Sequence, residues 1–383
     1  MNQKQSSRLL SLDVLRGITI AGMLLVNNPG TWSSIYAPLR HADWNGLTPT
    51  DLVFPFFMFI MGVSTYISLR KTEFKFTSEA LFKIMKRTFV IFSIGIALSW
   101  IGVFIGTYNN LEVANISIWK KLLESVTNFE HIRILGVMQR LAFTYCAASL
   151  IAILIKHKYI PAIVVSLLLG YSIFILVGNG YAQDGSSWLA IVDQNVLGLN
   201  HMYSEYGVDP EGILSTIPAI AHVLIGFCMG NILMNIKDNR ERMLQLFIYG
   251  AIFTFLGFLL SYAFPINKKI WSPSFVLVTC GMGATLLSLL IWIIDVNNKK
   301  KWSIFFESFG ANPLFLYVFG AFLGTLIDTV NVNNTTLKSW MFNGMLSLNM
   351  NVYFTSCLFA ILFVVACWIM GYPLYKRGIY IKI

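Results

Sequence analysis

Residues 159–178 read YIPAIVVSLLLGYSIFILVG, a run of twenty residues without a charged side chain. An α-helix needs about 20 mostly apolar residues to cross the hydrocarbon layer of a membrane, because each residue adds about 1.5 Å. The chain contains nine further runs of this kind, four before residues 159–178 and five after them, and Asn312 and Pro313 interrupt one of the later runs. The ten predicted spans are residues 12–30, 51–70, 88–106, 132–155, 159–178, 213–235, 244–264, 271–294, 304–328 and 350–373.

The composition of the whole chain supports the same conclusion. Of its 383 residues, 56% are hydrophobic and only 12% are charged, whereas soluble domains are about 45–50% apolar and about 25% charged. So little charge cannot cover a water-soluble protein of this size, and the composition also excludes a disordered chain and a small disulfide scaffold. We therefore predict an all-α polytopic membrane protein with about ten transmembrane helices, forming a single domain over residues 1–383.

The five cysteines all lie in apolar runs and form no Cys-x-x-Cys pair. This spacing indicates neither a zinc site nor a disulfide framework. Buried thiols that serve as small apolar side chains are the simpler interpretation, and we predict no metal site.

Lysine and arginine are distributed unevenly between the loops, and this distribution predicts the orientation of the chain. The chain carries 28 Lys and Arg against 18 Asp and Glu, a formal charge of +10. With the N-terminus in the cytoplasm, 19 of the 28 basic residues fall on the inner side and six on the outer side, and three lie in or beside spans. We therefore predict that both termini are cytoplasmic and that the surplus charge contacts anionic lipid heads rather than nucleic acid.

Two pairs of charged residues in or near the spans need an explanation, because a charge within a span costs at least about 2.5–3.5 kcal/mol. Asp13 and Arg16 share one helix face at the cytoplasmic start of the first span. They either pair with each other or form an anion site, such as one for a nucleotide phosphate. Arg133 and Arg140 are seven residues apart on one face of the fourth span, and they either contact a substrate or cofactor or pair internally.

The first outer loop carries the densest group of polar side chains. It contains Arg40-His41-Ala42-Asp43-Trp44-Asn45-Gly46-Leu47-Thr48-Pro49-Thr50-Asp51, and Asn27 lies at the end of the preceding span. Histidine is the side chain best suited to proton transfer near neutral pH. Asp43 or Asp51 could orient His41, and the sequence leaves the choice open. Asn27 could donate a hydrogen bond to an oxyanion.

Two later outer segments supply further candidates. Asp209-Pro210-Glu211-Gly212 precedes the sixth span, where Glu211 either caps the helix or lines an outer pocket. Asn267-Lys268-Lys269-Ile270-Trp271-Ser272 indicates a loop between two helices, with Trp271 expected at the membrane interface.

These segments resemble, in the same order, those of the heparan-α-glucosaminide N-acetyltransferase family. The resemblance is carried by Asn27 and by residues 11–17, 40–55, 133–141, 209–212, 265–272 and 375–380. It implies a transmembrane acyltransferase that takes acetyl from acetyl-coenzyme A on the cytoplasmic side and delivers it to an amino sugar on the lumenal or outer side. The catalytic histidine of the family falls on His41, and its assisting asparagine falls on Asn27.

The resemblance also limits the acceptor. The resemblance implies that lysosomal members carry an extra N-terminal lumenal domain and an additional first helix, and we expect neither in this protein. We therefore expect a bacterial relative in the inner membrane, with a smaller or different acceptor. The family also suggests a homodimer.

The residues and the resemblance together predict one tunnel with a cytoplasmic cofactor mouth and an outer acceptor mouth. His41 is predicted to take a proton from an acceptor amine or hydroxyl while Asn27 stabilises the oxyanion, with an acetyl-His41 intermediate as the alternative. The alternative function is a transporter or flippase of a sugar or lipid-linked intermediate. The predicted cofactor contacts are Asp13, Arg16 and Arg140, and the predicted acceptor contacts are Arg133, Trp44, Asn45, Glu211 and Asn267.

Overall fold

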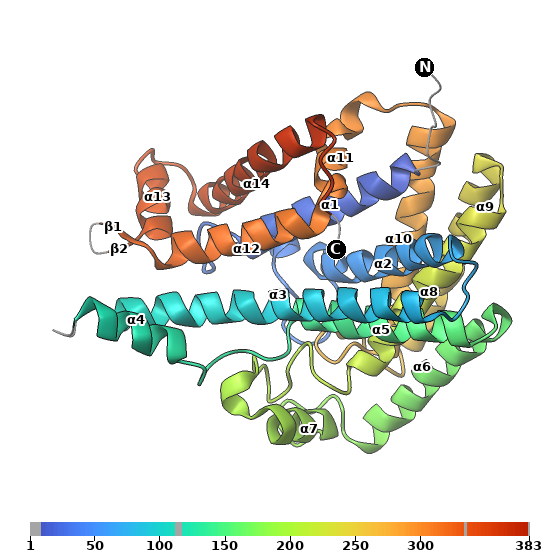
Figure 1. Cartoon of the computed structure of the whole chain (residues 1–383), viewed down its shortest axis with the longest axis horizontal. Helices are drawn as coiled ribbons and strands as arrows, with labels where there is room; N and C mark the ends of the chain where they lie inside the picture. Colours follow the sequence, from blue (N-terminus) through green and yellow to red (C-terminus); the bar gives the residue numbers. More distant parts are fainter. Residues whose placement is uncertain (1–8, 112–116, 333–334, 382–383) are drawn as a thin grey trace.

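The computed structural model describes residues 9–111, 117–332 and 335–381, and helices account for most of them (Figure 1). The helices are α1 (Leu10–Asn27), α2 (Val53–Arg70), α3 (Ser78–Asn110), α4 (Ile118–Thr127), α5 (Val137–Leu154), α6 (Ile160–Val177), α7 (Trp188–Leu197), α8 (Thr216–Asn235), α9 (Asn239–Leu260), α10 (Pro273–Leu290), α11 (Ile304–Ala311), α12 (Pro313–Thr329), α13 (Leu337–Leu346) and α14 (Val352–Lys376). Two antiparallel two-residue strands, β1 (Asn331–Val332) and β2 (Thr335–Thr336), lie between α12 and α13. The predicted all-α class is confirmed.

Within the described ranges, nine helices are long and apolar enough to cross a membrane. A tenth span results if the bent pair α11 and α12 counts as one. The prediction of about ten transmembrane helices is therefore confirmed, and the chain is a multi-pass integral membrane protein. The side of the membrane on which each terminus lies stays a prediction.

The α11–α12 pair bends by 76° at Asn312 and Pro313. Proline has no N–H to continue the hydrogen bonding of α11. The buried Asn312 side chain fixes the break from the other side, because its Nδ2 donates to the carbonyl of Ile379 at 2.8 Å and its Oδ1 accepts from the N–H of Ile381 at 2.7 Å. The interruption in the sequence is thus a true break between two helices.

The third span is longer than the sequence predicts. The apolar run covers residues 88–106, but α3 extends over 33 residues, from Ser78 to Asn110. The hydroxyl of Thr77 accepts a hydrogen bond from the N–H of Ala80 at 3.1 Å and so caps the first turn. The basic residues before position 88 therefore continue the helix beyond its apolar part.

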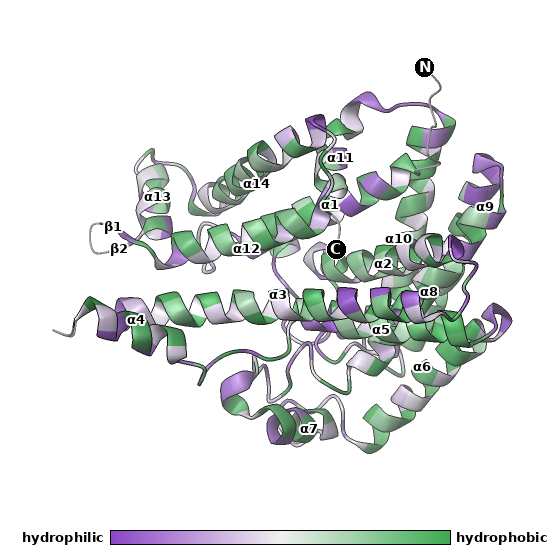
Figure 2. Cartoon of the chain, viewed as in Figure 1, coloured by the Kyte–Doolittle hydropathy of each residue, from purple (hydrophilic) through white to green (hydrophobic). Residues whose placement is uncertain are grey.

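Helices at the periphery, such as α3 and α9, contain many hydrophobic residues (Figure 2). Only 6% of the apolar segment of α3 is buried and only 17% of that of α9, against 67% for the segments that contain α2 and α8. Lipid, unlike water, is a suitable solvent for such surfaces. The central helices are therefore α2 and α8, and α3 and α9 face lipid.

The two central helices cross in direct backbone contact at two glycines. A Cβ atom on Gly226 would lie 2.3 Å from the carbonyl oxygen of Phe59, and one on Gly62 would lie 2.1 Å from that of Val223. Both contacts are with backbone atoms, which cannot move aside as the end of a flexible side chain would. Small residues at such crossings allow membrane helices to pack closely.

Replacing Gly226 with valine is expected to lower the free energy of unfolding by about 2 kcal/mol, because overpacking a dense region costs about 1–3 kcal/mol. Thermal unfolding of the purified protein in detergent measures this loss. The matched control is Gly102→Val on the lipid-facing α3, where an added Cβ meets no atom within 4 Å. Equal unfolding temperatures of the two variants would contradict a tight crossing at Gly226.

Connections that lie far apart in the sequence meet at one end of α1, α2, α5 and α8. The N–H of Gly46 donates to the carbonyl of Ile266 at 2.7 Å, and the N–H of Ile134 donates to that of His201 at 2.9 Å. Figure 1 shows α7 and the connections around it along the lower edge of the view. The candidate site is built from these connections.

Candidate functional site

His41 is hydrogen-bonded to Asp51, which decides between the two carboxylates that the sequence left open. The Nδ1 atom of His41 lies 2.6 Å from Oδ1 of Asp51. The His41 side chain is 43% exposed and that of Asp51 only 1%. Asp43 is exposed in the same loop, and no hydrogen bond joins it to His41 in the described structure.

Asp51 is held rigidly at the start of the second span. It lies in a 3-10 turn, Pro49–Leu52, which leads directly into α2. Its Oδ2 accepts hydrogen bonds from the N–H of Ala42 at 3.1 Å, from the N–H of Thr48 at 3.1 Å and from the Thr48 hydroxyl at 3.0 Å. With its second oxygen fixed in this way, the first is aimed at His41 and accepts from Nδ1–H, so that Nε2 remains as the acceptor atom of the ring.

A pocket of about 420 Å³ opens beside His41, on the side that the sequence predicts to be the outer one. Its wall combines two exposed aromatic rings with charged groups of both signs. Trp32 is 61% exposed, and the ring of Tyr206 lies edge-on against the buried Trp44 at 5.1 Å between centroids. The charged residues of the wall are Arg40, Asp43, Glu205 and Lys269, of which the last two form an ion pair.

Three residues that the sequence predicts to contact the acceptor instead contact other residues of the protein around this pocket. Trp44 lies behind Tyr206 and outside the pocket wall. The Nδ2 atom of the buried Asn267 donates to Oδ1 of Asn45 at 3.1 Å, and Oδ1 of Asn267 accepts from the N–H of Ile270 at 3.1 Å. Asn45 and Asn267 therefore tie the loop between α1 and α2 to the loop before α10.

Arg133 pairs internally, which is the second of its two predicted alternatives. Its Nη2 lies 2.6 Å from Oδ1 of Asp209 and 2.5 Å from Oε2 of Glu211. Burial opposes the charge on Glu211, but Arg133 and Arg140 hold the pKa of this carboxyl below its ordinary value. Glu211 does not cap α8, whose N-cap is Ser215, and it pairs with Arg133 instead. That Glu211 lines an outer pocket stays a prediction.

Arg140 is also bound internally and is 1% exposed. Its Nη2 donates to the carbonyl of Gly212 at 3.2 Å and to the Ser215 hydroxyl. Its guanidinium lies 5.0 Å from the ring centre of Trp271, which is fully buried within the protein, and the predicted place of Trp271 at the membrane interface stays a prediction. The Arg140 side chain is therefore too buried to touch a cofactor in this arrangement, and its predicted cofactor contact stays a prediction.

At the start of α1, Arg16 joins three helices. Its Nη1 donates to Oδ1 of Asp13 at 2.8 Å and to the carbonyl of Gly310 at 3.4 Å, and its Nη2 donates to the Ser64 hydroxyl at 2.8 Å. The predicted pairing with Asp13 is confirmed. The phosphate contact, the other alternative, stays a prediction.

Asn27, in the last turn of α1, is exposed and lines a second cavity of about 350 Å³ between α1 and α12. Tyr317 and Asp328 line the same cavity. The preceding residue, Val26, lines the pocket of His41. The last turn of α1 therefore touches both cavities, and none of the described hydrogen bonds joins Asn27 to His41.

A family model described as heparan-alpha-glucosaminide N-acetyltransferase, catalytic, matches residues 8–264. The chain belongs to this family. A relative of that name from Mus musculus is 28% identical over 383 residues, which covers 82% of this chain and 54% of the relative. The relative of that name from Homo sapiens is 28% identical over 375 residues, which covers 81% of this chain and 52% of the relative. The chain thus spans about half the length of the curated relatives that it matches.

The stretch that matches the N-acetyltransferase family contains His41, Asp51, Arg133 and Glu211. Sequence reasoning quoted Lys268 only as part of a loop between two helices and missed its contact with His41, in which Nζ of Lys268 lies 3.1 Å from Nδ1 of His41. The two residues are 227 positions apart, so no local pattern could link them.

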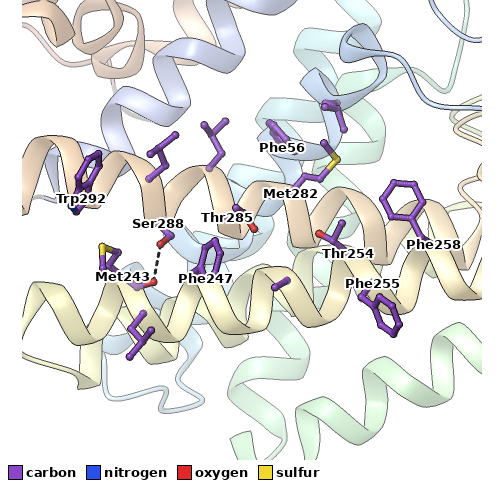
Figure 3. Close-up of a pocket in the computed structure, with 15 residues that line it drawn as sticks. Phe56, Met243, Phe247, Thr254, Phe255, Phe258, Met282, Thr285, Ser288 and Trp292 are labelled. Carbon is purple, nitrogen blue, oxygen red and sulfur yellow. Dashed lines mark hydrogen bonds between the residues drawn. The ribbon is translucent and has the colours of Figure 1, made fainter.

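A larger apolar cavity, of about 1110 Å³, lies between α9 and α10 (Figure 3). Its hydroxyl groups, on Thr254, Thr285 and Ser288, donate to backbone carbonyls, as the dashed line from Ser288 to Met243 shows. No charged side chain lines it. This cavity therefore suits lipid chains and offers nothing to orient a sugar for N-acetyl transfer. Among the residues with assigned positions, no group of three His, Cys, Asp or Glu could hold a metal ion.

Proposed function

We propose that this protein is a membrane-embedded acetyltransferase. It moves an acetyl group from acetyl-coenzyme A on the cytoplasmic side to the amino group of a glucosamine-like sugar, or to a sugar hydroxyl, on the outer side of a bacterial inner membrane. The observation that carries the proposal is the His41–Asp51 pair beside an outer pocket. The family of the chain supports it, since the relatives from mouse and human are named for N-acetyl transfer to a heparan glucosaminide.

His41 is the general base of the proposed reaction. Its Nε2 accepts a proton from the acceptor amine, and Asp51 stabilises the resulting imidazolium through Nδ1. The amine nitrogen then forms a bond to the thioester carbonyl carbon while Asn27 donates to the oxyanion. The carbon–sulfur bond breaks, and the coenzyme A thiolate leaves and takes up the proton that Nε2 of His41 accepted, which returns His41 to its neutral form. Asn27 reaches this oxygen only if the thioester lies between the two cavities that the last turn of α1 touches.

The wall of the outer pocket suits an amino sugar. The exposed face of Trp32 and the ring of Tyr206 offer apolar surfaces for a sugar ring. Asp43 and Glu205 can accept hydrogen bonds from hydroxyl or amino groups. The two acidic and two basic side chains of the wall balance each other, so the pocket has no strong preference for a polyanion.

Arg16 is the candidate for the coenzyme phosphates at the opposite end of α1. Arginine binds phosphate through paired hydrogen bonds, and the Arg16 guanidinium already donates to Asp13 and Ser64. A phosphate would take the place of the Asp13 carboxylate. Arg16 lies 11 residues before Asn27 on α1, which is a rise of about 16 Å along the helix, and the pantetheine arm would have to cross this distance.

Release of free thiol from acetyl-coenzyme A by the purified protein tests this proposal. We expect release with glucosamine and none with N-acetylglucosamine, which has the same ring but no free amine. Release with both sugars would indicate a hydroxyl acceptor. Failure to bind acetyl-coenzyme A at all would contradict the proposal.

The second candidate is a transporter or flippase of a sugar or lipid-linked intermediate. It is favoured by the broken span at α11 and α12, because broken helices often form the binding sites of transporters. Uptake of labelled glucosamine into vesicles without acetyl-coenzyme A would support it.

A further inference from the structure

Lys268 reaches the His41–Asp51 pair from a different part of the chain. Its Nζ lies 3.1 Å from Nδ1 of His41 and 3.5 Å from Oδ1 of Asp51. Its side chain is 20% exposed, which is low for a lysine in a connection between helices. The three side chains therefore form one cluster around a single ring nitrogen.

The backbone that carries Lys268 is fixed on both sides. Before it, the Tyr181 hydroxyl donates to the carbonyl of Pro265 at 2.8 Å. After it, the Tyr171 hydroxyl donates to the carbonyl of Ile270 at 2.6 Å. Asn267 is bound to Asn45 in the loop of His41. A lysine held in this way keeps its position relative to His41, whereas most loop lysines move freely in solvent.

The charges around the cluster act on the imidazole in opposite directions. Asp51 favours a positive charge on the ring, and the Lys268 ammonium opposes it. Burial lowers the pKa of Lys268, whereas Asp51, Glu211 and Glu205 act to raise it. The other charged groups at the pocket are Arg40, Asp43 and Lys269, and the last is paired with Glu205.

We propose that Lys268 is a positioning residue for His41: it holds the Asp51 oxygen that also contacts His41, while Thr48 binds the other oxygen, and its positive charge lies beside Nδ1 of the ring. This inference rests on the proposed function, in which His41 is the base. It assigns Lys268 no contact with the substrate and no bond to be made or broken.

The pH profile of His41 carbethoxylation by diethyl pyrocarbonate tests this role without either substrate. The reagent modifies the unprotonated ring, and mass spectrometry of the peptide that contains His41 separates this reaction from modification of lysines. In Lys268→Met, we expect the acid limb of the profile to move to higher pH by about one unit, since a nearby charge shifts such equilibria by about 1–3 units. Lys268→Arg, which keeps the positive charge, should restore most of the wild-type profile.

The matched control is Lys120→Met. Lys120 also lies beside a carboxylate, with its Nζ 3.9 Å from Oε1 of Glu124 on α4, so the variant removes the same charge elsewhere. Thermal unfolding shows whether each variant is folded. If Lys268→Met is folded and its profile coincides with that of wild type, or if Lys120→Met shifts the profile equally, the positioning role is overturned. Because no acetyl-coenzyme A is used, a failure of acetyl transfer leaves this result intact and counts against the proposed function alone.

Discussion

Replacing His41 with alanine is expected to reduce the rate of acetyl transfer by at least about 10²-fold, because a positioned general base contributes about 10²–10⁴-fold. The fold should tolerate the change, since the His41 side chain is 43% exposed. The measurement is the initial rate of thiol release from acetyl-coenzyme A in the presence of glucosamine.

The control for this substitution is His201→Ala. His201 lies in another of the connections predicted to be outside, and its Nδ1 is 2.9 Å from the carbonyl of Ile132, so its contact is with backbone. We expect this variant to keep the wild-type rate. If His41→Ala retained most of the activity while binding acetyl-coenzyme A normally, the proposed mechanism would be wrong.

A single turnover with labelled acetyl-coenzyme A separates direct transfer from the route through acetyl-His41. Label bound to His41 in the absence of a sugar would favour the covalent route. Direct transfer predicts that the protein carries no label until the acceptor is added.

The membrane helices could be predicted well from the sequence, because an apolar run of about 20 residues has few other stable environments. The break at Asn312 and Pro313 was also visible, since proline interrupts helical hydrogen bonding. The length of α3 could not be predicted from hydropathy. The apolar run shows only the part of the helix that contacts lipid, and a helix can continue beyond the lipid layer. The cap at Thr77 was the signal that could have located its start.

The candidate site was predictable only where its residues are close in sequence. Thr48 and Asp51 have the spacing of a capping box before an apolar run, and this pattern favours Asp51 over Asp43 as the buried, oriented carboxylate. Lys268 could not be predicted, because the fold of two separate loops brings it to His41. For Arg133, internal pairing was one of the two alternatives predicted from the sequence. Only the fold shows that its partners are Asp209 and Glu211.

Replacing Arg133 with methionine is expected to lower the free energy of unfolding by about 3 kcal/mol. Removing one partner of a buried ion pair costs about 3–5 kcal/mol because a charge is left buried, and the partial exposure of Arg133 places the effect at the lower end. Thermal or chemical unfolding in detergent measures the loss. Arg133→Lys keeps the charge but not the two-carboxylate geometry, and it should lose less.

The pH dependence of this loss identifies its cause. In the wild type, burial raises the pKa of Asp209 and Arg133 opposes that shift, while Arg133 also helps to hold the pKa of Glu211 low. Without Arg133, burial dominates, so the folded variant binds protons more readily than the unfolded chain does. A carboxyl whose pKa is raised in the folded state contributes stability at low pH that is lost as the pH rises.

The difference in free energy of unfolding between Arg133→Met and wild type should therefore narrow as the pH falls from 7 toward about 4. A second substitution, Glu211→Gln, should recover part of the lost stability at pH 7. A difference that is the same at every pH would indicate lost packing instead of two unpaired carboxylates.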